Sequence, residues 1–237
     1  MRHLAKAAAA GSLLITLAAA GGVLAQGAFK PSPKTSFFVT SVGSGKGGDL
    51  GGLAGADAHC TALATAAGIK GKTWHAYLST SGEGGVNARD RIGKGPWYNV
   101  KGVEMASSVD DLHSVNNELS KANSLTEKGT VVNGVGDMPN QHDILTGSDG
   151  EGKLAAPVAR IPPNQPPGTP PPPAPANMTC NNWTSSEGGG TMLGHNDRKG
   201  GGAAATSWNA SHAGAGCSQA QLVQTGGNGQ FYCFATN

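Results

Sequence analysis

Short stretches of patterned hydrophobic residues along the chain predict a mixed α and β domain. Residues 37–42 are rich in β-forming residues and predict a first strand. Apolar residues recur at spacings of three and four over residues 53–67, which predicts a short helix that Gly68 ends. From Trp74 to Ser79 apolar and polar residues alternate, which predicts a half-buried strand.

The rest of the chain carries weaker patterns, which predict short elements joined by loops. These elements are a helical turn at 87–92, a short strand at 97–100, a short helix within 109–125, a buried strand end at 144–147 and a strand at 230–234, with 126–153 otherwise mostly loop. Residues 162–175 are dominated by proline, which favours an extended polyproline conformation and does not pair into a sheet.

The N-terminus has the three features of a secretory signal peptide. Arg2 and Lys6 are followed by an apolar stretch, which ends at Ala25 in a small-x-Ala cleavage pattern. We therefore expect residues 1–25 to be removed on export and residues 26–36 to form a leader to the domain. The alternative is a membrane anchor, but glycine, serine and threonine dilute the stretch. No cysteine follows the cut, which disfavours a bacterial lipid anchor, and no other apolar run could insert into a membrane.

The charge balance indicates which classes of partner the protein can bind. The full chain has 17 lysines and arginines and 15 acidic residues, so removal of Arg2 and Lys6 leaves 15 of each. A formally neutral chain with only four remaining arginines lacks the basic surface of a nucleic-acid-binding protein. We expect no nucleic acid partner.

The cysteines indicate an oxidising environment. Cys60, Cys180, Cys217 and Cys233 form an even set in an exported chain, which argues for disulfides, and four cysteines allow three pairings. Only Cys60 precedes the proline-rich tract, so any bridge from it crosses the tract. We therefore interpret residues 162–175 as an insertion within one domain, residues 37–237, rather than as a linker between two domains.

No catalytic motif is present, and we expect the protein not to be an enzyme. The chain has no HExxH, no CxxC and no G-x-S-x-G. His142 and Asp143 are adjacent, but without a second histidine at ligand spacing they make a poor metal site, so we expect no metal centre. A weak calcium site remains open, because residues 149–151 and 196–197 offer oxygen atoms, although their spacing does not match an EF-hand.

One loop is the best candidate for ligand binding. Trp208 lies in a stretch rich in glycine, alanine, serine and asparagine, and we expect it to be the most exposed of the four tryptophans. An exposed tryptophan could stack on a sugar or anchor a protein partner. The candidate site residues are Asn196, Asp197, Arg198, Trp208 and Asn209.

Six segments in order resemble endostatin, the collagen-derived domain with a C-type-lectin-like α+β fold. They are residues 56–60 with 67–79, Asn87-Ala88-Arg89-Asp90-Arg91, residues 145–150, Cys180-Asn181-Asn182-Trp183, Cys217 and Tyr232-Cys233-Phe234. The pattern, which spans residues 37–237 apart from the insertion, is also similar to bacterial endostatin-like surface proteins known from leptospires. The resemblance implies nested bridges, with Cys60–Cys233 outside and Cys180–Cys217 inside.

The chain departs from that family at its known ligand sites. Endostatin binds zinc through an N-terminal histidine cluster, and residues 26–45 contain no histidine. Its heparin binding rests on an arginine patch that this neutral chain lacks. Calcium-dependent lectins carry Trp-Asn-Asp before the third cysteine, whereas Ala210 follows Trp208-Asn209 here and offers no oxygen ligand.

These observations predict an exported binding domain in the periplasm, at the cell surface or secreted. Its expected partner is a glycan or an extracellular matrix protein, bound through the loop around residues 190–212. Two alternatives remain: a structural envelope protein without a ligand and a periplasmic hydrolase.

Overall fold

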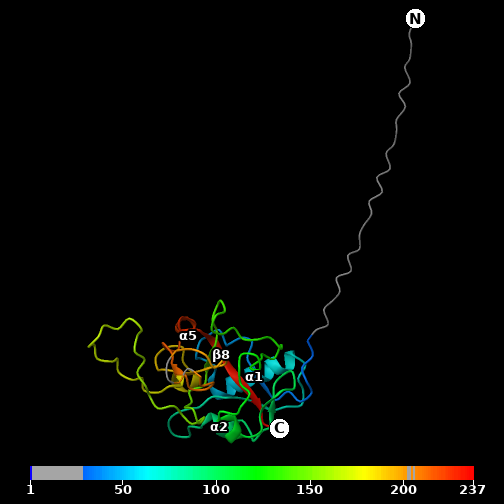
Figure 1. Ribbon diagram of the computed structural model, residues 1–237, viewed down its shortest axis with the longest axis horizontal. Coiled ribbons are helices and arrows are strands. Elements are labelled where there is room, and N and C mark those ends of the chain that lie inside the picture. The colour runs from blue at the N-terminus through cyan, green and yellow to red at the C-terminus, as the bar shows by residue number, and fades with distance from the viewer. Residues whose placement is uncertain (2–28, 202–203, 205) are drawn as a thin grey trace.

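The computed structural model describes residue 1, residues 29–201, residue 204 and residues 206–237 (Figure 1). Apart from Met1, the predicted signal peptide at 1–25 lies outside the described residues, as do the first three residues of the predicted leader. Within the described part of the chain, no helix is long and apolar enough to cross a membrane.

The nine-residue strand β8 (Gly227–Ala235) organises the fold because three other strands pair with it. β1 (Phe37–Val39) and β2 (Trp74–Ala76) pair with its C-terminal half in antiparallel orientation. β5 (Asp143–Leu145) pairs with its N-terminal half in parallel orientation. All but one of the nine residues of β8 are buried, as expected for a central strand.

The sheet continues outward from β5 through β6 (Met192–His195) to β7 (His212–Ala213), and both pairings are antiparallel. A separate two-stranded sheet is formed by β3 (Trp97–Tyr98) and β4 (Glu104–Ala106). The protein is therefore a mixed α+β fold built on one mixed sheet.

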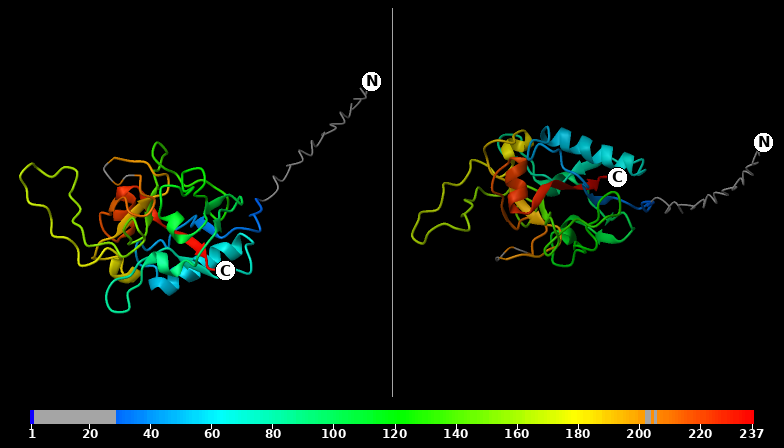
Figure 2. Two further views of the ribbon diagram at one scale, coloured as in Figure 1. Left: turned by 60° about the horizontal axis from the view of Figure 1, so that its bottom comes forward. Right: turned by 90° about the horizontal axis from the view of Figure 1, so that it is seen from above.

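Two layers cover the main sheet, one on each face (Figure 2). The helix α1 (Gly52–Ala66) lies on one face and buries Ala56, Cys60 and Ala64 in the first core cluster. The segment that contains β3 and β4 lies on the other face and contributes Trp97 and Met105 to the second cluster. Aromatic rings of the sheet fill that second cluster, where the ring centres of Phe37 and Phe234 lie 4.9 Å apart.

The other helices are short. They are α2 (Ala88–Arg91), α3 (Val109–Leu112), α4 (Cys180–Trp183) and α5 (Gln219–Thr225). α5 has strong end signals, because Ser218 and Gln221 form a capping box and Gly226 ends the helix in the left-handed region at φ 100°. All four residues of α4 have positive φ, so this element is a left-handed turn rather than an α-helix.

The expected helix within 109–125 is a single turn. Beyond Leu112 the Asn117 side chain donates to the carbonyls of Leu112 and Ser114, at 3.0 and 2.6 Å. This side chain replaces the amide donors that would continue the helix, a known effect of asparagine. Val115 is 85% exposed instead of packing on the core.

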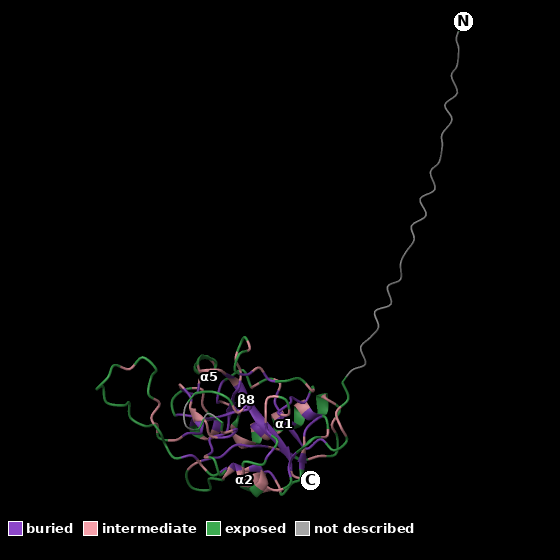
Figure 3. Cartoon of the chain, viewed as in Figure 1, coloured by how far each residue is buried: buried purple, intermediate pink, exposed green. Residues whose placement is uncertain are grey.

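Both disulfides expected from the resemblance are present. Cys60 on α1 pairs with Cys233 on β8, and Cys180 on α4 pairs with Cys217. The outer bridge spans the proline-rich residues 162–175, which carry no helix or strand and are almost entirely exposed (Figures 1 and 3).

The folded unit begins earlier than the predicted boundary at residue 37. The amide of Ser32 donates to the carbonyl of Val100 and that of Ser36 donates to Tyr98, both at 2.8 Å. Thr35 and Ser36 are buried. The second half of the predicted leader is therefore part of the domain.

Candidate functional site

Four of the five site residues chosen from sequence are buried. Trp208 is only 3% exposed, and Asn196, Asp197 and Asn209 are also buried. The expectation that Trp208 is the exposed tryptophan is wrong, because its ring packs 4.7 Å from Tyr77 and 5.2 Å from Tyr232 in the second core cluster. Of the predicted site residues, Arg198 alone is partly exposed.

These residues instead hold the loop to the core. Asn209 donates through Nδ2 to the hydroxyl of Tyr77 at 3.0 Å and to the carbonyl of Asp149 at 2.9 Å. Arg198 donates through Nε to the carbonyl of Thr206 at 3.1 Å. Asn209 therefore anchors its part of the loop to the core, and Arg198 bonds within the loop.

Next to this loop the sheet gathers histidines and a carboxylate on one face. Asp143 on β5 and His195 on β6 are direct cross-strand partners. His212 on β7 is the partner of Leu193, and Leu193 shares a face of β6 with His195 because side chains alternate along a strand. The register of three neighbouring strands thus brings Asp143, His195 and His212 together, although up to 69 positions separate them in sequence.

Three imidazoles converge on one oxygen of Asp143. The Nε2 atoms of His142, His195 and His212 lie 3.4, 3.2 and 3.3 Å from Asp143 Oδ1. The Asp143 side chain is fully buried, and those of His142 and His195 are nearly so, whereas His212 keeps 35% of its side chain exposed. The cluster is therefore closed toward the core and reaches the surface through His212.

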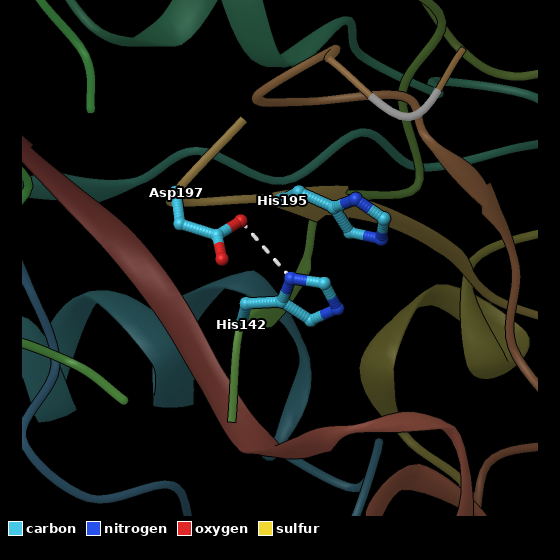
Figure 4. Close-up of side chains that lie close together, drawn as sticks. All are labelled: His142, His195 and Asp197. Atoms are coloured by element: carbon cyan, nitrogen blue, oxygen red, sulfur yellow. Dashed lines mark hydrogen bonds and ion pairs between the residues drawn. The ribbon is translucent and has the colours of Figure 1, made fainter. Parts of the chain in front are cut away.

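A second carboxylate orients His142. The Nδ1 atom of His142 donates to Asp197 Oδ1 at 3.0 Å (Figure 4). The Nε2 atom of the same ring therefore faces Asp143. The His142 and His195 rings are stacked at 4.0 Å. Asp197 is itself held by the amides of Val135 at 2.7 Å and Lys199 at 3.1 Å. It is therefore a supporting partner of His142.

The electrostatics keep both carboxylates ionised. Burial alone raises the pKa of Asp197, but the hydrogen bonds from His142, Val135 and Lys199 outweigh it and hold the pKa at about 2. Burial also raises the pKa of Asp143, and the imidazoles of His195 and His212 outweigh it, so the net pKa lies below the usual range. The Asp143 carboxylate in turn raises the pKa of His212, against the effect of partial burial.

A groove of about 730 Å³ opens over His212. One side is formed by residues 158–161, which precede the proline-rich tract, and the other includes Gly201, Ala204 and residues 210–213. Arg160 links the two sides by donating to the carbonyl of Ala213 at 3.2 Å. Its walls are mainly apolar, and its lining includes Val158, Arg160, Ile161, Met192, His212 and Thr225. Among the described residues that line it there is no acidic side chain and no phenylalanine, tyrosine or tryptophan.

Sequence reasoning found only half of this site. It noted the adjacent His142 and Asp143 but not the two histidines that join them. One sequence signal could have pointed to the site. His195 and Asp197 are two residues apart at the end of a short apolar segment, and residues with that spacing share one face of a strand. His212 carried no such signal, because β7 has only two residues and exists through its pairing with β6.

No protein-family model matches this chain. No curated protein matches it in sequence either.

Proposed function

We propose that this chain is an exported, non-enzymatic binding domain that holds a segment of an extracellular protein in the groove over His212. The C-type-lectin-like, endostatin-like form of its α+β fold is part of this proposal. The observation that carries it is the groove itself, which combines apolar walls with the cationic Arg160.

The disulfides support export. Both bridges join buried cysteines, and disulfides form and persist in oxidising environments outside the cytoplasm. They tie α1 to β8 and α4 to the segment before α5, and so provide a rigid base for a binding site built from loops.

The lining of the groove favours a protein segment over a glycan. Sugar sites commonly use an aromatic ring as a stacking platform, and the described lining residues offer no such platform apart from the imidazole of His212. Ile161 is 62% exposed and Val158 43% exposed, so apolar surface is available to a partner. Arg160 supplies positive charge, and no acidic side chain is among the described lining residues. The complementary ligand is an apolar segment that carries a carboxylate.

An array of matrix proteins and glycans probed with the purified, oxidised protein tests this function. We expect binding to at least one protein, and we expect Ile161→Asp to weaken it by at least about 10-fold, because a carboxylate would then replace an apolar contact and repel the ligand. Val115→Asp is the matched control, since Val115 is exposed outside the groove. Binding to sugars alone, or binding that Ile161→Asp leaves intact, contradicts the proposal.

A further inference from the structure

We infer that Asp143, His195 and His212 bind a divalent transition metal ion of the zinc class, with His142 beside them as a fourth nitrogen donor. No sequence motif predicts this site. It lies beneath the groove and does not depend on what the groove holds, so it stands or falls separately from the proposed function.

The distances fit metal ligands better than hydrogen bonds. Zinc bonds to imidazole nitrogen and carboxylate oxygen are about 2.0–2.2 Å long, so neighbouring ligand atoms in a tetrahedral site lie about 3.3–3.5 Å apart. The three contacts to Asp143 Oδ1 are 3.2, 3.3 and 3.4 Å. A charged N–H to carboxylate hydrogen bond is shorter, about 2.7–2.9 Å.

The proton positions of two histidines point to a cation between them and Asp143. His142 Nδ1 faces the Asp197 carboxylate, and His212 Nδ1 faces the carbonyl of Ala213, each at 3.0 Å. Both of those oxygens only accept, so Nδ1 carries the proton in each ring. The Nε2 atom of each ring is therefore the one left to coordinate a cation, and in both rings it faces Asp143 Oδ1.

The burial of Asp143 requires a positive partner. Its side chain is 0% exposed, and within the described residues neither of its oxygens has a partner with hydrogen-bond geometry. A buried carboxylate without such partners is strongly unfavourable, and buried charges in proteins are paired or coordinate metals. One divalent ion satisfies Oδ1 and the surrounding nitrogen atoms together.

The ring arrangement distinguishes the main ligands from the neighbour. Two imidazoles on one tetrahedral ion have ring centres about 5 Å apart, given the bond lengths above. The His195 and His212 rings are 5.0 Å apart and inclined at 69°. The His142 and His195 rings are stacked with their centres 4.0 Å apart, which is closer than two imidazole ligands of one ion would lie (Figure 4). His195 and His212 are therefore in place to bind, and His142 joins them only after its ring moves.

The supporting contacts are those of a metal site. Histidine ligands usually donate their second nitrogen to a carboxylate or a backbone carbonyl, which fixes the ring and its tautomer. Asp197 does this for His142, and Ala213 does it for His212. A donor set rich in imidazole suits zinc and related ions, whereas calcium and magnesium take oxygen ligands.

Calorimetric titration of Zn²⁺ into the purified, oxidised protein, first stripped with a chelator, tests the site. We expect one Zn²⁺ per chain and no comparable heat from Ca²⁺ or Mg²⁺. His212→Gln should weaken zinc binding by at least about 100-fold, because it removes a ligand, and Asp197→Asn should weaken it by about 10–100-fold through His142. His59→Gln is the matched control, since this partly exposed histidine lies outside the cluster and contacts the carbonyl of Val42.

Co²⁺ gives a second readout that a merely structural role would not produce. Bound in the tetrahedral site, it should show visible absorption bands that disappear in Asp143→Asn, a change of nearly the same size that should keep the fold. Absence of zinc binding by the folded wild-type protein would overturn the inference. Zinc binding and cobalt bands that persist unchanged in both Asp143→Asn and His212→Gln would overturn it as well.

Discussion

Trp208 holds the described part of the loop between β6 and β7 to the core through its ring and its backbone. Its indole Nε1 donates to the carbonyl of Leu112 at 3.2 Å, and its own carbonyl accepts from the hydroxyl of Tyr232 at 2.8 Å. The ring itself lies against Tyr77. The loop carries His195 at one end and His212 at the other, so these contacts also fix the histidines.

Replacement of Trp208 by alanine should therefore destabilise the protein. We expect Trp208→Ala to lower the free energy of unfolding by about 3–5 kcal/mol, because it leaves a cavity in an aromatic cluster and removes one of the two side-chain hydrogen bonds to the carbonyl of Leu112. Chemical denaturation of the two proteins measures the difference. Met138→Ala is the control, since Met138 is almost fully exposed. A loss below about 1 kcal/mol for Trp208→Ala would show that the ring does not support the loop.

At the scale of elements, β6 depends on a glycine. Gly194 lies between Leu193 and His195, and a Cβ built on it would collide with the backbone of Trp208 and Asn209. The amide of His195 donates to the carbonyl of Ser207 at 3.0 Å, so the loop lies directly against this strand. Only a residue without a side chain allows that approach.

Gly194→Ala should push the loop away from β6. We expect it to lower the free energy of unfolding by about 1–3 kcal/mol, as overpacking does, and to weaken zinc binding through displacement of His195. Gly150→Ala is a matched control, because a Cβ there meets open space. Thermal unfolding and the zinc titration measure both effects, and equal results for the two variants would contradict the account of β6.

The sequence predicted those elements whose own residues carry a clear hydrophobic pattern. The apolar spacing around Cys60 gave α1 within one residue at each end, and the aromatic run at Phe231 indicated β8. The α+β class and both disulfide pairings were also expected, the pairings only through the resemblance. β6 and β7 were missed because they are short and glycine or histidine interrupts their apolar pattern.

The candidate site was missed for a related reason. Its residues meet through strand pairing over long sequence distances, which local pattern does not reveal. The left-handed turn at Cys180–Trp183 is similar, since no propensity favours four positive φ angles. There Asn182 bonds both the amide and the carbonyl of Ser81, at 2.7 and 3.0 Å, so tertiary contacts impose the conformation.

At the scale of the whole molecule, the two disulfides close loops of very different length. Cys60 and Cys233 are 173 positions apart, whereas Cys180 and Cys217 are 37 apart. In the chain-entropy description a bridge stabilises by restricting the unfolded chain, and the effect grows with loop length. The 38 glycines of the sequence widen the unfolded ensemble that the bridges restrict.

Removal of the outer bridge should cost more than removal of the inner one. We expect Cys60→Ser with Cys233→Ser to lower the free energy of unfolding by about 2–5 kcal/mol. Cys180→Ser with Cys217→Ser should cost about 1 kcal/mol less, because its loop is shorter. Denaturation of both double variants measures the order, and a larger loss for the inner pair would contradict the entropic explanation.

The metal content of the protein as isolated tests the central claim about its site most directly. The chain would be exported by a cell, purified without chelator or added metal, and analysed for its elements alongside Asp143→Asn. We predict about one zinc ion per wild-type chain and none in the variant, since the Nε2 atoms of His195 and His212 lie at the distance from Asp143 Oδ1 that neighbouring zinc ligands keep. Wild-type protein without transition metal, or a variant that carries as much, would contradict the site.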